Sequence, residues 1–212
     1  MPASSTSDRF SMPLGEAMYN MRAIRRLKPD PVALEDLRDI VDAARQAPSP
    51  SNRQSWHFLV VQDAEQRAKL GAIYREAWWA KRRDEGFHKP EDFDPNDKVR
   101  MSAMRLADHF GDAPAVILMC ADSSAMVDTT GVIPATQNLL LAARSLGLGA
   151  TITSLHPSVM DDVRALFGMP EGTFVVYAIP VGYPQGNFGP VTRKPLNEVA
   201  SLDRWGEPLP EA

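Results

Sequence analysis

Cysteine is nearly absent from this 212-residue sequence, in which Cys120 is the only one. A single thiol excludes an internal disulfide and any metal site built from several thiolates. Cys120 also ends an apolar stretch without a basic neighbour in sequence that would lower its pKa, so a packed, inert thiol is expected. Any redox chemistry must therefore come from another group.

Other absences narrow the class of protein. The sequence has no run of about 18 uncharged apolar residues and no N-terminal signal with charged, apolar and cleavable parts. With 23 basic and 27 acidic side chains the net charge is −4, which offers no strong field to nucleic acid or anionic lipid. We therefore expect a soluble cytoplasmic protein whose partners include neither nucleic acid nor a membrane.

Self-contained catalytic machinery is also missing. There is no G-x-S-x-G elbow, Walker A loop, G-x-G-x-x-G, H-E-x-x-H or C-x-x-C motif. The sequence has four histidines, His57, His88, His109 and His156. Their neighbours in sequence are unlike those of a metal-ligand set. Packed or solvated imidazoles are therefore expected, and no metal site is predicted.

The order of the expected elements indicates one α+β or α/β domain. Helices are expected over residues 14–26 and 33–47, in two stretches between 63 and 110, over 132–146, and from a capping box at Ser158 to 167; strands are expected over 56–62, 115–120, 150–154 and 173–181. This order favours a sheet covered by helices on both faces. The helix over 132–146 is apolar nearly all round, which predicts a central core helix, a subunit interface, or both.

The two ends of the chain differ from the part between them. Residues 1–12 are small and polar and are expected to be mobile, so the domain proper is expected over 13–189. Residues 190–212 form an extension that has almost no periodicity of its own but carries large apolar side chains such as Trp205. Such a tail requires a surface on which to lie.

Three separated segments carry residue types that suit a phosphorylated, planar, redox-active ligand. Arg22, Arg25 and Arg26 are spaced i, i+3 and i+4, so on a helix end they would share one face and could converge on an anion; a solvated basic patch has the same spacing. The loop APSPSNRQSW cannot pair its own backbone and offers free N–H and amide groups. The segment ATITSLH offers hydroxyls, although threonine is also simply a good strand former, and GPVTRKPL adds Arg193.

Together these segments resemble the FMN-dependent nitroreductase family, in order and separation, from about Tyr19 to Leu196. The family's R-R-S-x-R-x-F-like stretch corresponds to MRAIRRL, and its A-P-S-x-x-N-x-Q-P-W-x-F segment to APSPSNRQSWHF. Its buried Q-N-L-L-L-A-A-x-x-L-G-L-G helix corresponds to QNLLLAARSLGLG, and its closing P-V-G-Y with a basic P-L element to IPVGYPQGNFGPVTRKPL. The resemblance implies the nitroreductase fold, a mixed and mainly antiparallel sheet with helices on both faces, in an intertwined homodimer.

The resemblance also implies contacts to FMN. Arg22 and Arg193 match the residues that hold its phosphate, where a bidentate guanidinium suits the anion. Arg25 matches a basic residue near the N1 and O2 edge of the flavin ring. The loop that reaches the flavin from the other subunit corresponds to Pro48, Ser49 and Asn52. The strand end beside the ring corresponds to Ile152, Thr153 and Ser154.

The implied reaction is ping-pong hydride transfer from NADH or NADPH through N5 of FMN to a small conjugated acceptor such as a nitroaromatic or a quinone. The cofactor carries this chemistry, which explains why no catalytic acid, base or nucleophile stands out. Met21 and Ala23 depart from the Arg and Ser of many members at the phosphate, and Arg26 could compensate there. A flavin-binding or storage protein with little turnover is therefore the alternative function.

Two further regions have roles that the resemblance leaves less defined. Trp79 and Phe93 lie in a charged, aromatic region that could form a lid over the flavin and contact substrate; they could equally pack a helix onto the core. Residues 190–212 would lie on the partner subunit and bury Trp205 there, as C-terminal extensions do in this family.

Overall fold

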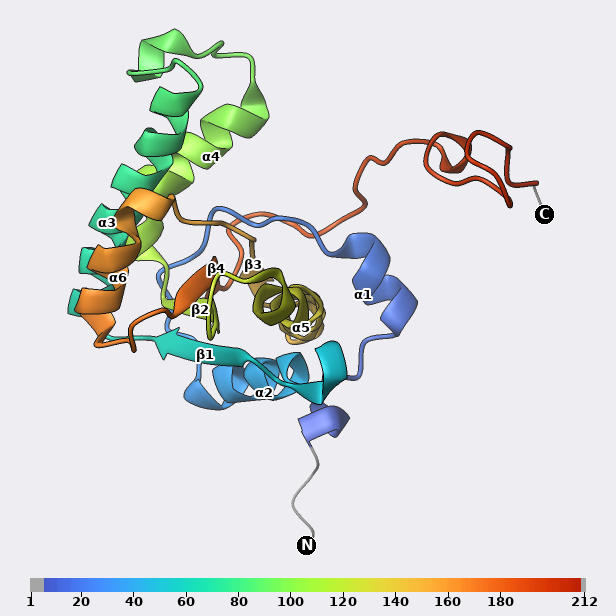
Figure 1. Cartoon of the computed structure of the whole chain (residues 1–212), viewed down its shortest axis with the longest axis horizontal. Coiled ribbons are helices and arrows are strands. Elements are labelled where there is room, and N and C mark those ends of the chain that lie inside the picture. The colour runs from blue at the N-terminus through green and yellow to red at the C-terminus, as the bar shows by residue number, and fades with distance from the viewer. Residues whose placement is uncertain (1–5, 211–212) are drawn as a thin grey trace, which may run out of the picture.

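A four-stranded antiparallel sheet lies at the centre of the computed structural model, which describes residues 6–210 (Figure 1). The strands are β1 (Trp56–Val61), β2 (Ala115–Ala121), β3 (Gly149–Ala150) and β4 (Phe174–Gly182). Their order across the sheet is β1-β2-β4-β3, with Phe58 opposite Met119 and Ile117 opposite Ile179. The predicted α+β fold is confirmed, and all the described strand pairs are antiparallel.

Helices cover both faces of this sheet. The α-helices are α1 (Leu14–Asn20), α2 (Leu34–Ala44), α3 (Ala64–Asp84), α4 (Lys98–Asp108), α5 (Met126–Ser145) and α6 (Met160–Phe167). Short 3-10 helices lie at Thr6–Arg9, Pro50–Asn52, Pro90–Asp92, Phe110–Asp112, Pro157–Val159 and Leu196–Glu198. None of the helices in residues 6–210 has the length and apolar character that crossing a membrane requires.

The alternation of side chains along β2 builds two cores, one on each face. Ile117 and Met119 pack with α2 and α5, whereas Leu118 and Cys120 pack with α3, α4 and α6. A strand that is buried on both faces has no polar positions, which is why residues 115–120 form a continuous apolar run. In Figure 1 the α2–α5 layer and the α3–α4–α6 layer lie on opposite sides of the strands.

Helix α5 is the central helix that the sequence predicts, although it begins at Met126 rather than at residue 132. Leu139 and Ala143 on one of its faces are fully buried in the core. Near its N-terminus the apolar side chains of Met126 and Ile133 are 82% and 53% exposed, so part of its surface has no apolar neighbour in this chain. The helix is thus buried on the sheet side and open on another.

The largest departure from the sequence prediction concerns residues 21–26, which are extended rather than helical. Helix α1 ends at Asn20, and Met21 already has extended backbone angles. The backbone N–H of Ile24 donates to the carbonyl of Ala150 at 3.0 Å, and Leu27 pairs with Pro184. Pairing with the edge of the sheet therefore replaces continuation of the helix.

Three smaller expectations also need correction. The strand predicted over residues 150–154 is limited to β3 and a single bridge between Thr153 and Ala178. Helix α6 begins at Met160 without a side-chain cap, because Ser158 lies in a preceding 3-10 turn and its hydroxyl bonds to Nδ1 of His156 at 2.7 Å. Helix α2 begins one residue later than predicted and ends three residues earlier, at Ala44.

The N-terminal segment contacts the domain within its described part. The guanidinium of Arg9 binds the carboxylates of Asp36, at 2.6 Å, and Asp39 on α2, and Phe10 packs against the core. These contacts tie residues 9 and 10 down, where the sequence suggested a mobile segment. Residues 1–5 lie outside the described part, and the domain boundary at residue 12 stays a prediction.

The C-terminal extension leaves the domain as a separate arm (Figure 1). Its side chains are exposed from residue 201 to 210, and Trp205 is as exposed as in an extended peptide, at 103%. The arm closes on itself through a bridge between Ser201 and Pro208. Within residues 6–210, Trp205 therefore has no surface on which to lie.

Candidate functional site

A basic cavity of about 400 Å³ lies where residues 21–25 cross the end of β3. Its polar wall includes Arg22, Arg25, Arg193 and Gln137, the last from α5. Its apolar wall includes Leu140 of α5 and Ile152. The cavity thus combines three cations with an apolar side.

The approach of the arginine segment to β3 depends on a glycine. Ile24 is buried, and a Cβ added at Gly149 would lie only 2.7 Å from its Cγ2 atom. An alanine at this position would have to displace Ile24, because real Cβ contacts do not come this close. Gly149 therefore lets the extended segment run alongside the sheet, with the exposed Arg22 and the half-buried Arg25 at the cavity.

The guanidinium groups at the cavity have no carboxylate partner. Among residues 6–210, neither Arg22, Arg25 nor Arg193 forms an ion pair, and the recorded side-chain bond of Arg193 goes to the neighbouring carbonyl of Thr192 at 3.0 Å. Uncompensated like charges at one cavity repel one another, whereas a phosphate accepts charge-assisted hydrogen bonds from several guanidiniums. The electrostatics of this cavity therefore favour an anion.

Hydrogen bonds to β4 and α3 hold the backbone at residues 153–154, beside the cavity. Ile152 lines the cavity, and the next residue, Thr153, exchanges hydrogen bonds with Ala178 of β4, whose N–H donates to the Thr153 carbonyl at 2.9 Å. The ammonium of Lys81 on α3 donates to the carbonyl of Ser154 and, at 2.9 Å, to its hydroxyl. Thr153 and Ser154 thus fix the backbone next to Ile152, and their hydroxyls already have partners.

Two titratable groups from α3 lie behind this strand end. Burial raises the pKa of Tyr74, against the opposing effects of its hydrogen bond with Thr153 and the positive charge of Arg25. Burial also lowers the pKa of Lys81, and the neighbouring charge of Arg82 lowers it further. The phenol therefore stays neutral and acts as a hydrogen-bonding group, and Arg25 is close enough to affect it.

The structure brings together five of the residues predicted for the cofactor and separates others. The five that line the basic cavity are Arg22, Ala23, Arg25, Ile152 and Arg193. Arg26 does not line that cavity; it lines a neighbouring one of about 270 Å³, which Arg22, Arg25 and Ser102 of α4 also line. Because residues 21–26 are not helical, the three arginines do not share a helical face, although all three line this smaller cavity.

The loop over residues 48–52 lies apart from the basic cavity in its own chain. Asn52 is exposed, and Ser51, Asn52 and Gln54 have positive φ angles of 50°, 54° and 53°. The Gln54 N–H donates to the hydroxyl of Ser49 at 3.1 Å, and a Cβ at Gly131 of α5 would lie 3.1 Å from the Ser49 Cβ. The loop is thus fixed against α5 and presents Asn52 outward. Its contact with a flavin in another subunit stays a prediction.

Trp79 and Phe93 belong to an aromatic cluster that joins α3 to the segment before α4. The Phe93 ring is 5% exposed and lies 5.8 Å from Trp78, 6.0 Å from Trp79 and 4.9 Å from Phe87 between ring centroids. Neither Trp79 nor Phe93 lines the basic cavity. Within one chain the packing alternative accounts for both residues, and their contact with substrate stays untested.

Sequence reasoning missed the contribution of α5 to the cavity, and of the tail it found Arg193 but not Val191. Gln137 is one of the few polar residues in an otherwise apolar helix, and this isolated polarity was the available signal. Leu140 and Val191 also line the cavity, but neither has a feature that distinguishes it in sequence.

Cys120 is the packed, inert thiol that the sequence predicts. Burial raises the pKa of Cys120 to about 12, so this thiol is not a nucleophile near neutral pH. In the part of the chain that the structure describes, His, Cys, Asp and Glu side chains do not gather in threes that could hold a metal ion.

Comparison with known proteins assigns the chain and its fold to a family. The sequence profile of the Nitroreductase family matches residues 19–183. A Methanothermobacter thermautotrophicus protein, provisionally named NADH dehydrogenase/NAD(P)H nitroreductase, is 31% identical over 199 residues, which cover 90% of this chain and 86% of that protein. An iodotyrosine deiodinase of Thermotoga neapolitana is 28% identical over 185 residues, or 84% of this chain and 90% of the relative.

A solved structure of the same fold extends the comparison. The crystal structure of oxidized iodotyrosine deiodinase bound to FMN and 3-iodo-L-tyrosine superposes with a TM-score of 0.70 at 26% sequence identity, and covers 91% of this chain and 99% of that one. Sequence and fold therefore agree over most of the chain. The chain belongs to the nitroreductase family of oxidoreductases.

Proposed function

We propose that the chain is an FMN-dependent oxidoreductase that takes a hydride from NADH or NADPH and delivers the electrons to a small conjugated acceptor, such as a nitroaromatic or quinone. The observation that carries this proposal is a cavity with three unpaired guanidiniums, from Arg22, Arg25 and Arg193, in a member of this family. The similar iodotyrosine deiodinase structure contains FMN. The relative from Methanothermobacter is named for NAD(P)H.

The residues at the cavity fit the chemical parts of FMN. Arg22 and Arg193 offer forked N–H donors to a phosphate, and neither has a competing carboxylate among the described residues. Leu140 and Ile152 offer apolar contact to a flat ring. The volume of about 400 Å³ lies within the range of roughly 300–1,000 Å³ that is usual for cofactor sites.

When bound, FMN would supply the two-electron chemistry, which no side chain of the protein can provide. The chain itself provides binding and electrostatics. Arg25 would hold a positive charge beside the ring, and Ile152 would exclude water from one side of it. Lys81 and Thr153 would keep the adjacent backbone in place through their bonds to Ser154 and β4.

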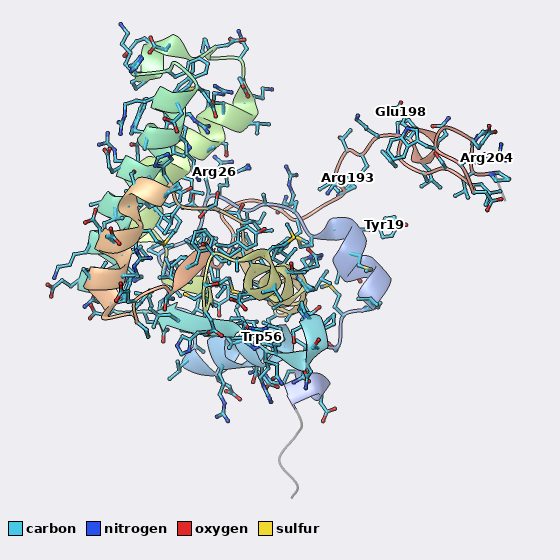
Figure 2. The ribbon with its side chains drawn as sticks, in the orientation of Figure 1. Tyr19, Arg26, Trp56, Arg193, Glu198 and Arg204 are labelled. Atoms are coloured by element: carbon cyan, nitrogen blue, oxygen red, sulfur yellow. The ribbon has the colours of Figure 1, made fainter. Side chains whose placement is uncertain are left out.

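We further propose a homodimer in which each site contains residues of both chains. Apolar side chains are exposed where α1 and α5 have no neighbour: Met18 is 53% exposed, Tyr19 79% and Ile133 53%. Figure 2 shows Tyr19 pointing away from the domain. Exposed apolar patches of this kind favour association. In the dimer, the loop with Asn52 would reach the cavity of the partner, and the C-terminal arm would cover Trp205 on it.

A flavin-binding or storage protein with little turnover is the second candidate. Met21 and Ala23 line the cavity, and neither side chain offers a hydrogen-bond donor to a phosphate. Met21 also packs against the core, so its side chain is committed elsewhere. Weaker retention of the cofactor would favour this alternative.

The purified protein tests both candidates. For the oxidoreductase it should be yellow, bleach when NADH or NADPH is added without oxygen, and recover its colour when a nitroaromatic or a quinone follows. A yellow protein that does not bleach would support the binding protein instead. A colourless protein that takes up no added FMN would contradict both.

A variant locates the cofactor within the chain. Arg22→Gln should weaken FMN binding at least about tenfold, because it removes a charge-assisted phosphate contact. Arg45→Gln is the matched control: this exposed arginine directly follows α2, pairs with Asp42 and does not line the cavity. Equal FMN affinities of the two variants would show that Arg22 does not bind the FMN phosphate.

A further inference from the structure

A second, larger cavity of about 470 Å³ lies between residues 25–29 and the C-terminal end of α4. Arg25 and Arg26 line one wall, and Arg105 and His109 line the other. Figure 2 shows Arg26 beneath α4, where the α3–α4 arm meets the sheet. Arg25 lines both this cavity and the basic cavity proposed for FMN, so the two are neighbours joined by one side chain.

The guanidiniums of this second cavity are also unpaired. Among the ion pairs of residues 6–210, none involves Arg26 or Arg105. The acid in the wall, Asp112, has its Oδ2 atom 2.9 Å from Nδ1 of His109 and forms no ion pair with either arginine. By contrast, Arg75 on the neighbouring α3 pairs with Asp108 at 2.8 Å. Two cations facing one cavity from different elements can hold a doubly charged phosphate.

The rest of the cavity suits a flat, largely apolar group. Its lining includes Leu27, Pro29, Leu106 and Ala113. Its volume exceeds the needs of a lone phosphate and suits a ligand with an organic part beside its anion. Of the molecules in the proposed reaction, the nicotinamide dinucleotide has such a part far from its reacting ring: the adenosine, which in NADPH carries a 2′-phosphate. Arginine is a common partner of that phosphate.

We propose that this cavity binds the 2′-phosphoadenosine part of NADPH, with Arg26 and Arg105 as its phosphate ligands, so that the chain prefers NADPH to NADH. The inference rests on the proposed function and deepens it by naming the reductant. Arg25 lies on the side of this cavity that faces the proposed FMN site. Arg105 lies on the α4 wall, where contact with the 2′-phosphate would discriminate between the two dinucleotides.

Calorimetric titration of the FMN-loaded protein with two probes tests this proposal. Adenosine 2′,5′-bisphosphate carries the 2′-phosphate, and adenosine 5′-monophosphate lacks it. The wild-type protein should bind the bisphosphate at least about tenfold more tightly. Arg105→Gln, on an exposed helical position where glutamine is a good helix former, should reduce this ratio to less than about twofold. Arg105→Lys should restore part of it.

Lys69→Gln is the control for the loss of one positive charge. Lys69 is exposed on α3, pairs with Glu65 at 2.7 Å and does not line the cavity, so both affinities should match the wild type. Equal binding of the two probes by the wild type would overturn the proposal, as would an unchanged ratio in Arg105→Gln. Displacement of the bisphosphate by inorganic phosphate at equal concentration would show a general anion site and would also overturn it.

These outcomes are independent of the proposed oxidoreductase activity. A protein that is yellow and bleaches with NADH and NADPH at equal rates retains the proposed function and loses the 2′-phosphate site. A protein without flavin loses the proposed function before any probe is added.

Discussion

Gly149 determines how closely the arginine segment approaches the sheet. A Cβ at this position would lie 2.7 Å and 2.9 Å from two atoms of the Ile24 side chain. Gly149→Ala should therefore displace Ile24 and, with it, Arg22 and Arg25. We expect the free energy of unfolding to fall by about 1–3 kcal/mol, as overpacking does, and the affinity for FMN to fall several-fold.

Urea unfolding and FMN titration check this prediction. Gly15→Ala is the control, because a Cβ there meets nothing within 4 Å and Gly15 lies within α1. The control should be neutral or stabilise the protein by up to about 1 kcal/mol. If Gly149→Ala bound FMN as tightly as the wild type, close packing on β3 would not position the arginines.

For single residues, the sequence predicts which arginines meet at the basic cavity, but not the backbone geometry that brings them together. Arg22, Arg25 and Arg193 follow from the resemblance, and the cavity contains all three. The helical spacing argument for Arg22, Arg25 and Arg26 is wrong, because Ile24 pairs with Ala150, more than a hundred residues away in sequence. Local periodicity carries no information about such a distant backbone partner.

An aromatic cluster joins α3 to the segment that precedes α4. Phe93 contacts Trp78, Trp79 and Phe87 and is nearly inaccessible. Phe93→Ala should leave a cavity and lower the free energy of unfolding by about 3 kcal/mol. FMN affinity should stay within twofold of the wild type, because Phe93 does not line the basic cavity.

Thermal unfolding and FMN titration measure these two effects separately. Val99→Ala on the same helical arm is the control, since Val99 is 68% exposed and its truncation should change stability by less than about 0.5 kcal/mol. A change in substrate KM without loss of stability in Phe93→Ala would contradict the packing role and support the lid predicted from sequence.

Elements with strong periodicity are the ones that sequence predicts well. Strand β2 reads as an uninterrupted apolar run because both of its faces are buried, and α2 shows a clear apolar stripe. Helix α1 and strand β3 are shorter than expected, since both end where residues 21–27 join the sheet. Their limits depend on contacts between segments distant in sequence, which a local pattern does not contain.

At the scale of the whole molecule, the C-terminal arm finds no surface to lie on among the residues that the structure describes. If it lies on a partner, removal of residues 197–212 should raise the dimer dissociation constant at least about tenfold, measured by sedimentation. Trp205→Ala should weaken the dimer in the same direction, since a tryptophan exposed at 103% in one chain would lose its contact area in the dimer. A truncated chain that dimerises as tightly as the full chain would contradict this role.

A mixed dimer tests whether each flavin site is shared between two chains. One chain carries Arg22→Gln and the other Asn52→Gly, in which glycine keeps the positive φ of 54° at position 52. Each variant alone should bind FMN weakly in both sites. If each site takes Arg22 from one chain and Asn52 from the other, the mixed dimer has two different sites. One site carries both substitutions, and the other carries neither. Co-expression with two affinity tags should therefore restore about half of the wild-type FMN content.

If both residues served the same chain's site, every site in the mixed dimer would carry one substitution and no FMN content would return. Recovery of FMN content therefore distinguishes a shared site from two separate ones.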